Sequence, residues 1–122
     1  MSSELFSEIY NKALDILSRR EHSVLELKQK LQKKFDTEYD IKETISRLKK
    51  NNLLNDYRFS ESYVVFRKRK GFGPIKISNE LKSKGVAEVI IFEVLDNEGG
   101  WDEAANRAFS KRFKDGPSTD TK

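Results

Sequence analysis

The chain repeats one apolar pattern in two successive halves. The segment from Arg19 to Leu27 returns in altered form as Arg69 to Ile77, at a spacing of 50 residues that later falls to 46. The matched positions are Leu27 with Ile77, Leu31 with Leu81, Lys34 with Lys84, Ile45 with Ile91, and Leu48 with Val94. Tandem helical units bury their apolar faces against their neighbours and offer a long surface to a partner. The repeat therefore favours a binding protein over an enzyme.

The spacing of the apolar residues predicts seven helices. They cover residues 4–20, a segment after Ser23, a segment from Asp40 to Asn51-Asn52, residues 57–70, a segment from Pro74 to Gly85, residues 86–97, and a segment that begins at Trp101-Asp102. The β-branched run after Val86 is compatible with a strand, but the spacing of Ile91, Val94 and Leu95 favours a helix.

Residues at the predicted helix ends have the chemistry of caps and stops. Ser23 and Glu26 form a capping box, Asp40 repeats that logic for the third helix, and Asp56 is the expected N-cap of the fourth. The remaining structural positions are Gly71, Gly73, Pro74 and Gly85, where glycine permits the turn and proline starts the fifth helix. We expect this Gly-x-Gly turn to be structural, since no strand precedes it as in a phosphate loop.

The expected fold is all-α, with tandem three-helix units that resemble helix-turn-helix motifs. Two complete repeats, residues 1–55 and 56–100, precede residues 101–114 as the first helix of a third, and residues 115–122 are an expected disordered tail. Leu31 and Leu81 are the predicted buried equivalents of the two repeats. The fourth helix is expected to carry Phe59, Tyr63 and Phe66 on one apolar stripe, and the seventh helix contains Ala105, Ala108 and Phe109.

Composition narrows the class of protein. Hydrophobic residues make up 36% of the 122 residues and charged residues another 36%, and the mean hydropathy is −0.75. The absence of cysteine excludes disulfides and thiolate metal sites. No apolar run approaches the ~18 residues of a membrane span, and the N-terminus lacks the pattern of a signal peptide. We expect a cytoplasmic monomer with no membrane contact.

Charge is unevenly distributed along the second half of the chain. The net charge is +4 and the pI about 9.2, yet residues 67–84 hold seven cations and one anion, Glu80. The cations are Arg67, Lys68, Arg69, Lys70, Lys76, Lys82 and Lys84. Those around the glycine-proline turn are expected to gather on one rim and contact an anionic partner. The alternative is a helix C-terminus whose cations complement the helix dipole.

The sequence predicts no catalytic, cofactor or metal site. His22 lies in the turn before Ser23 without a nucleophile or an orienting partner nearby, so we expect an ordinary polar loop residue. Six acidic residues without a cation follow the basic segment: Glu88, Glu93, Asp96, Glu98, Asp102 and Glu103. They lack the spacing of a calcium loop, and helix-dipole and solubility roles explain them.

Three motifs, in order, resemble those of the RecX family of regulatory proteins. They are Arg20-Glu21-His22-Ser23 with Glu26-Leu27-Lys28 and Lys30-Leu31, then Leu53-Leu54-Asn55-Asp56 with Arg58-Phe59, and Lys70-Gly71-Phe72-Gly73-Pro74 with Lys76-Ile77, Glu80-Leu81 and Lys84-Gly85-Val86. The resemblance covers about residues 9–112. Asn52 stands where the family usually has glycine, and members commonly complete a third repeat.

The resemblance implies a function as well as a fold. Family members are all-α, bind the RecA recombinase filament in its helical groove, and restrain strand exchange, ATP hydrolysis and co-protease activity. Weak binding to single- or double-stranded DNA is a further expectation. The alternative function is a direct nucleic-acid-binding module that uses the fourth and fifth helices. An enzyme is not favoured, because no constellation of catalytic residues supports one.

Overall fold

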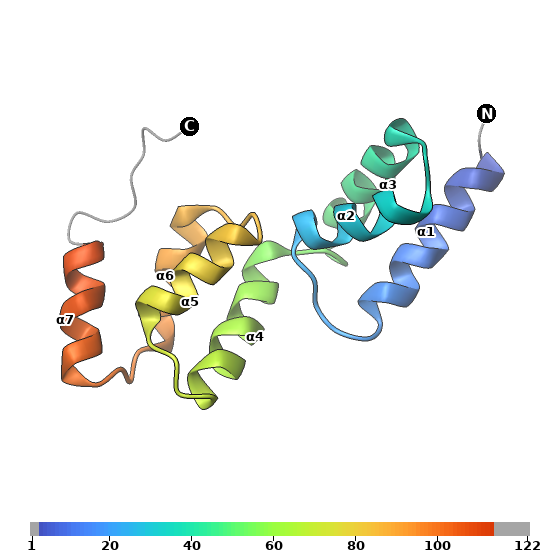
Figure 1. Cartoon of the computed structure of the whole chain (residues 1–122). Coiled ribbons are helices and arrows are strands. Elements are labelled where there is room, and N and C mark those ends of the chain that lie inside the picture. Colours follow the sequence, from blue (N-terminus) through green and yellow to red (C-terminus); the bar gives the residue numbers. More distant parts are fainter. Residues whose placement is uncertain (1–2, 114–122) are drawn as a thin grey trace. The chain divides into compact units, whose positions relative to one another are not determined.

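The computed structural model describes residues 3–113, and every regular element in that range is an α-helix (Figure 1). In chain order the helices are α1 (Ser3–Leu17), α2 (Val24–Lys34), α3 (Glu38–Lys50), α4 (Asp56–Arg69), α5 (Pro74–Ser83), α6 (Glu88–Glu98) and α7 (Glu103–Arg112). The predicted all-α fold is therefore confirmed, including a helix rather than a strand after Val86. None of the helices between residues 3 and 113 is both long and apolar enough to cross a membrane. The predicted disordered tail, residues 115–122, lies outside the described residues.

The chain divides into two compact units, Met1–Asp56 and Tyr57–Lys122. In the first unit α1 packs against α2 and α3, and α2 packs against α3. Its core consists of Ile9, Ala13, Leu27, Leu31, Ile41, Ile45, Leu48 and Leu54. The burial predicted for Leu31 and for Leu81, its counterpart in the second unit, is confirmed, because both side chains are fully buried.

The capping box predicted at the start of α2 is present. The Ser23 hydroxyl accepts a hydrogen bond from the Glu26 N–H, and the Glu26 carboxylate accepts one from the Ser23 N–H, both at 3.1 Å. These two bonds satisfy two of the backbone donors that a helix start leaves without an intrahelical partner. They fix the residue at which α2 begins.

The prediction that Asp40 starts the third helix is wrong, because α3 begins at Glu38. Its N-cap is Thr37, whose hydroxyl accepts from the Asp40 N–H at 3.4 Å and donates to the Asp40 carboxylate at 3.0 Å. Threonine and aspartate can both cap a helix, and here Thr37 takes the cap and Asp40 the third helical position. At the other end Asn52 adopts a left-handed conformation, with φ of 59°. Asparagine tolerates this conformation, which explains why it can replace glycine there.

Asp56 is the first residue of α4 rather than the residue before it. Its carboxylate accepts a hydrogen bond from the Val24 N–H at 2.8 Å, 32 residues away in the chain. The carboxylate therefore binds the start of α2, a contact between distant segments that helix-capping rules do not predict. Burial raises the pKa of Asp56, and this hydrogen bond and the charge of Lys49 oppose that rise.

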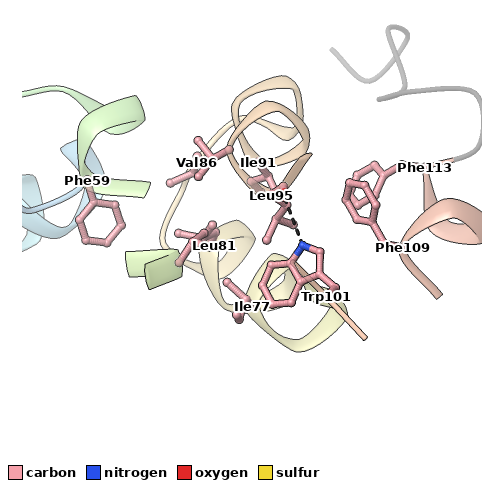
Figure 2. Packing of buried hydrophobic residues seen from close by; sticks show 11 residues of the cluster. Phe59, Ile77, Leu81, Val86, Ile91, Leu95, Trp101, Phe109 and Phe113 are labelled. Atoms are coloured by element: carbon pink, nitrogen blue, oxygen red, sulfur yellow. Dashed lines mark hydrogen bonds between the residues drawn. The ribbon is translucent and has the colours of Figure 1, made fainter. Parts of the chain in front are cut away.

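The second unit has its own aromatic-rich core, drawn in Figure 2. Its buried members are Phe59, Val64, Ile77, Leu81, Val86, Ile91, Val94, Leu95, Trp101, Phe109 and Phe113. Helix α5 packs against both α6 and α7. The Trp101 indole N–H donates to the Leu95 carbonyl oxygen at 3.2 Å (Figure 2). By its contacts α7 belongs to the second unit, and its assignment to a third repeat stays a prediction.

The apolar stripe predicted for α4 is only partly right. Phe59 is buried, but Tyr63 is half-buried and Phe66 is 53% exposed, while Ser60 and Val64 are buried in their place. Side chains four residues apart lie on one helix face, so Ser60 and Val64 define a face next to the predicted one. In α7 Ala108 is exposed and Phe109 is buried.

Candidate interaction surface

In the basic segment of the second unit, a partly buried network of hydrogen bonds surrounds the one anion, Glu80. The Arg67 guanidinium donates two hydrogen bonds to the Glu80 carboxylate, at 2.9 and 2.8 Å, and the Tyr63 hydroxyl donates a third at 2.9 Å. The same guanidinium lies 4.0 Å from the centre of the Phe72 ring. A two-point bond of this kind fixes the orientation of an arginine, so Arg67 faces its own unit.

Lys76 completes this network from the next turn of α5. Its ammonium lies 3.7 Å from the Glu80 carboxylate and 5.5 Å from the Phe72 ring centre. The hydrogen bonds from Arg67 hold the pKa of Glu80 below its usual value, and the Tyr63 hydroxyl and the charge of Lys76 act in the same direction. Glu80 therefore stays ionised and holds two of the seven predicted contact residues together.

Lys68 is also directed into the second unit. Its ammonium forms an ion pair with Glu98 at 3.2 Å and donates to the Gly99 carbonyl oxygen at 2.6 Å. It also lies 4.8 Å from the centre of the Trp101 ring. A lysine with a carboxylate, a carbonyl and an indole as neighbours is a structural residue, although the sequence indicates a surface cation.

The other four cations of the segment differ in exposure, while the side chain of Lys76 is itself 57% exposed. Arg69, Lys70 and Lys82 are exposed, and Lys84 is half-buried with its ammonium 5.5 Å from the Tyr63 ring. Lys70 lies 5.0 Å from the exposed Phe66 ring. The single rim expected for the cations around the glycine-proline turn is thus divided: Arg67 and Lys68 make internal contacts, and the exposed cations remain the candidates for a contact with a partner.

The acidic residues that follow the basic segment also have specific partners. Glu88 pairs with Arg112 at 3.0 Å, Glu98 with Lys68, and Asp102 caps α7 by accepting from the Ala105 N–H at 2.8 Å. Within residues 3–113 no three potential metal-ligating side chains come together. Glu88, Glu98 and Asp102 therefore serve the second unit itself, two as ion-pair partners and one as a helix cap.

His22 differs most from its prediction. It lies in the turn between α1 and α2 as expected, but only 1% of it is exposed. Its Nδ1 lies 3.0 Å from the Arg20 carbonyl oxygen and its Nε2 lies 2.8 Å from the Lys30 ammonium nitrogen. Because a carbonyl oxygen only accepts, Nδ1 carries the proton and Nε2 accepts from Lys30. The only signal for the His22–Lys30 contact in the sequence is their spacing of eight residues. This spacing brings the two side chains close together only after α2 has formed.

The fold and this surface define a protein of tandem three-helix units whose charged residues stabilise the units and leave a few cations exposed. Comparison with known proteins gives that class a family. Residues 10–48 match the first three-helix domain of RecX, and residues 55–95 match the second. The chain belongs to the RecX family.

Relatives and solved structures agree with this assignment. The regulatory protein RecX of Haemophilus influenzae strain PittEE is 44% identical over 115 residues, which cover 93% of this chain and 73% of the relative. That of Legionella pneumophila strain Corby is 37% identical over 109 residues, 88% of this chain and 73% of the relative. These relatives are named as regulatory proteins.

Two crystal structures share the fold. RecX from Lactobacillus salivarius has a TM-score of 0.73 and 26% identity, over 93% of this chain and 75% of that one. Another structure, of a regulatory protein RecX, has a TM-score of 0.76 at 21% identity, and the match covers 92% of this chain and 54% of that chain.

Proposed function

We propose that this chain is a non-catalytic regulator that binds the nucleoprotein filament of the RecA recombinase and restrains its recombinase and co-protease activities in DNA repair and recombination. The observation that carries the proposal is the match of both three-helix units, in order, to the two RecX domains. The filament is the partner that the family resemblance implies. A protein with this partner acts in the cytoplasm, where it requires no cofactor of its own.

The exposed cations of the second unit support an electrostatic part of that contact. Arg69 is the last residue of α4 and Lys70 follows it, while Lys82 lies in the last turn of α5. None of them has a carboxylate within 4.0 Å among the described residues, unlike Lys68 and Lys76. A nucleoprotein filament carries DNA phosphates, and exposed cations that are not paired with a carboxylate of their own chain are able to approach them.

The test is a salt titration of filament binding. RecA is assembled on single-stranded DNA with a non-hydrolysable ATP analogue, and binding of the fluorescently labelled chain is followed by anisotropy between about 50 and 200 mM salt. The triple variant Arg69→Gln, Lys70→Gln, Lys82→Gln is expected to bind more weakly. Its log–log salt slope is expected to be shallower by about 0.7 for each single-strand phosphate contact that is lost.

The first unit provides a matched control. Lys33, Lys34 and Lys50 are also exposed cations at helix C-termini, so their replacement by glutamine removes the same charge. The control variant is expected to keep most of the affinity and the slope of the unaltered chain. Equal losses in both variants would assign the effect to net charge alone. The absence of binding to the filament, or of any effect on the ATP hydrolysis of filaments assembled with ATP, would overturn the proposal itself.

One observation favours the alternative, direct binding of nucleic acid. Phe66 is an exposed aromatic ring with the Lys70 ammonium 5.0 Å from its centre, and it lines a shallow hollow of about 390 Å³ together with Glu61, Ser62, Val65 and Arg69. Single-stranded nucleic acids bind surfaces that combine aromatic rings for stacking with cations for phosphates. Under this alternative the chain binds bare single-stranded DNA as tightly as the filament, and Phe66→Ala weakens both. Under the filament proposal binding to bare DNA is much weaker.

A further inference from the structure

A groove of about 300 Å³ lies between α2 and α3 in the first unit. It is lined by Val24, Lys28, Lys42, Ile45, Ser46 and Lys49. Val24 and Ile45 provide its apolar part, three lysines provide its charge, and none of the lining residues is acidic. Lys28 lies 3.7 Å from Glu38, and the charge of Lys49 lowers the pKa of Asp56, which is not part of the lining. Lys42 is exposed and has no carboxylate within 4.0 Å among residues 3–113.

The internal repeat identifies the same place in the second unit. The repeat spacing of 50 residues for α2 and α5, and of 46 for α3 and α6, assigns each lining residue a counterpart. The counterparts, in the same order, are Pro74, Ser78, Glu88, Ile91, Phe92 and Leu95. In the second unit Pro74, Ser78, Ile91 and Leu95 are buried and the other two counterparts are half-buried. In the first unit only Ile45 is buried, two lining residues are half-buried, and the other three are exposed.

In the second unit α7 contacts these counterparts. Phe109 stacks on Phe92 with ring centres 5.8 Å apart, and Phe113 lies 5.5 Å from the same ring. Arg112 forms an ion pair with Glu88 at 3.0 Å. The counterparts are therefore buried because an amphipathic segment covers them. That segment has two aromatic residues four positions apart, Phe109 and Phe113, and a cation, Arg112, next to the second. Figure 2 shows Phe109 and Phe113 on the same side of the core.

The charge at the equivalent position is reversed in the first unit. Lys42 occupies the place of Glu88, and Lys28 and Lys49 replace the uncharged Ser78 and Leu95. A helix with the charges of α7 would place Arg112 against Lys42, which is a repulsive pair. A helix of the same shape with a carboxylate at the position of Arg112 is able to contact the apolar part of the groove and to pair with its lysines.

We propose that the groove between α2 and α3 is a docking site for an acidic amphipathic helix of a partner protein. Its apolar side chains contact Val24 and Ile45, and its carboxylates pair with Lys28, Lys42 and Lys49. Helices commonly bind grooves of this kind through apolar residues spaced three and four positions apart. A nucleic acid would use the lysines but leave the apolar part of the groove without a contact, so the protein helix is the occupant that fits the whole lining.

The test uses the chain's own α7 as a template for two peptides. The first peptide is residues 101–113 unaltered, and the second carries Lys111→Glu and Arg112→Glu. Both keep Asp102, which caps the helix. Each is titrated to about 1 mM, the weak end of measurable affinity, into the full ¹⁵N-labelled chain while amide shifts are recorded. We expect the acidic peptide to shift amides around Val24, Ile45 and Lys49, and to bind roughly tenfold or more tightly than the unaltered one.

A charge reversal in the groove provides the control. Lys42→Glu is expected to invert the preference, so that the unaltered peptide binds more tightly, whereas Lys50→Glu, at an exposed position outside the lining, keeps it. Equal binding of both peptides, shifts confined to other residues, or no shifts at all would each overturn the proposal. Stronger shifts of the groove amides with a single-stranded oligonucleotide than with the acidic peptide would reassign it to phosphate. The experiment needs no recombinase, so its result is independent of the proposed filament binding.

Discussion

The Lys68 ammonium lies against Trp101, 4.8 Å from the centre of its indole ring, while it donates a hydrogen bond to the carbonyl oxygen of Gly99 at 2.6 Å. Lys68 lies near the end of α4, and its two neighbours belong to the connection between α6 and α7. A Cβ atom at Gly100 would come within 2.9 Å of the Lys68 ammonium nitrogen, so glycine leaves room for this contact. One lysine thus joins two segments of the second unit that are far apart in sequence.

Replacement of Lys68 by alanine is expected to destabilise the second unit by about 1–2 kcal/mol. The loss combines a cation–π contact with a charged hydrogen bond to a carbonyl, partly screened because the side chain is 28% exposed. The adjacent Arg69→Ala, at an exposed position, is the control and is expected to stay within about 0.5 kcal/mol of the unaltered chain. Chemical denaturation of both variants measures the difference, and equal stabilities would show that Lys68 is only a surface cation.

Leu31→Ala and Leu81→Ala are each expected to reduce the free energy of unfolding of their own unit by about 2–5 kcal/mol. Both leucines are fully buried, and truncation removes apolar contacts and leaves a cavity. Amide hydrogen exchange resolves the two units, because each variant should increase exchange mainly in the unit that contains it. Leu53→Ala, which replaces a 43%-exposed leucine, is a control with the same chemistry. A loss below about 1 kcal/mol at either buried leucine would contradict its place in the core.

Loss of the capping box is expected to destabilise the first unit by about 1 kcal/mol. Glu26→Ala removes the acceptor for the Ser23 N–H, which then lacks its partner at a buried helix start. Glu26→Gln keeps an acceptor oxygen at the same place and is expected to restore most of the stability, although it loses the exposed pairing with Arg20. If the alanine and glutamine variants unfold at the same denaturant concentration, charge rather than capping is the contribution of Glu26.

Much of the fold follows from local rules in the sequence. The repeat of Leu31 at Leu81 predicts a shared core position, and the Ser23 pattern predicts the start of α2, because both depend on residues a few positions apart. The same rules misplace the start of α3, where Thr37 and Asp40 are both able to cap and tertiary packing decides. They also miss that Ser60 and Val64, rather than Phe66, face the core, since burial of a helix face is a tertiary property.

The candidate surface was less predictable, because side-chain direction near a helix end depends on the neighbours. Seven cations are evident in the sequence. Nothing local indicates that Arg67 in α4 binds Glu80, which lies 13 residues later in α5, or that Lys68 contacts Gly99. A single internal anion, Glu80, was visible, and its position between cations was the available clue. The exposed cations could be assigned only after the internal contacts had been found.

The buried His22 is expected to make the stability of the first unit depend on pH. Burial lowers the pKa of His22 below its ordinary 6.5, and the positive charges of Arg20 and Lys30 add to the effect, while the hydrogen bond to the Arg20 carbonyl and the charge of Glu26 oppose it. Because the folded pKa is the lower one, the unfolded chain binds more protons at intermediate pH. The stability that His22 contributes is therefore complete above about pH 6.5 and is lost as the pH falls through the folded pKa.

His22 is the only histidine, so the interval just below pH 6.5 is nearly free of other titrations. Asp56 acts in the opposite direction, because its pKa is raised from 3.8 and acidification favours its folded state. We expect the free energy of unfolding of the first unit to fall between pH 7 and pH 5.5. Chemical denaturation measures it, with hydrogen exchange at the Leu27 and Leu31 amides as the readout for this unit. His22→Gln removes the titrating group and should flatten that profile, whereas Asp56→Asn should leave the loss in place. A profile that keeps its slope in His22→Gln would assign the pH dependence to another group and contradict the role of the buried imidazole.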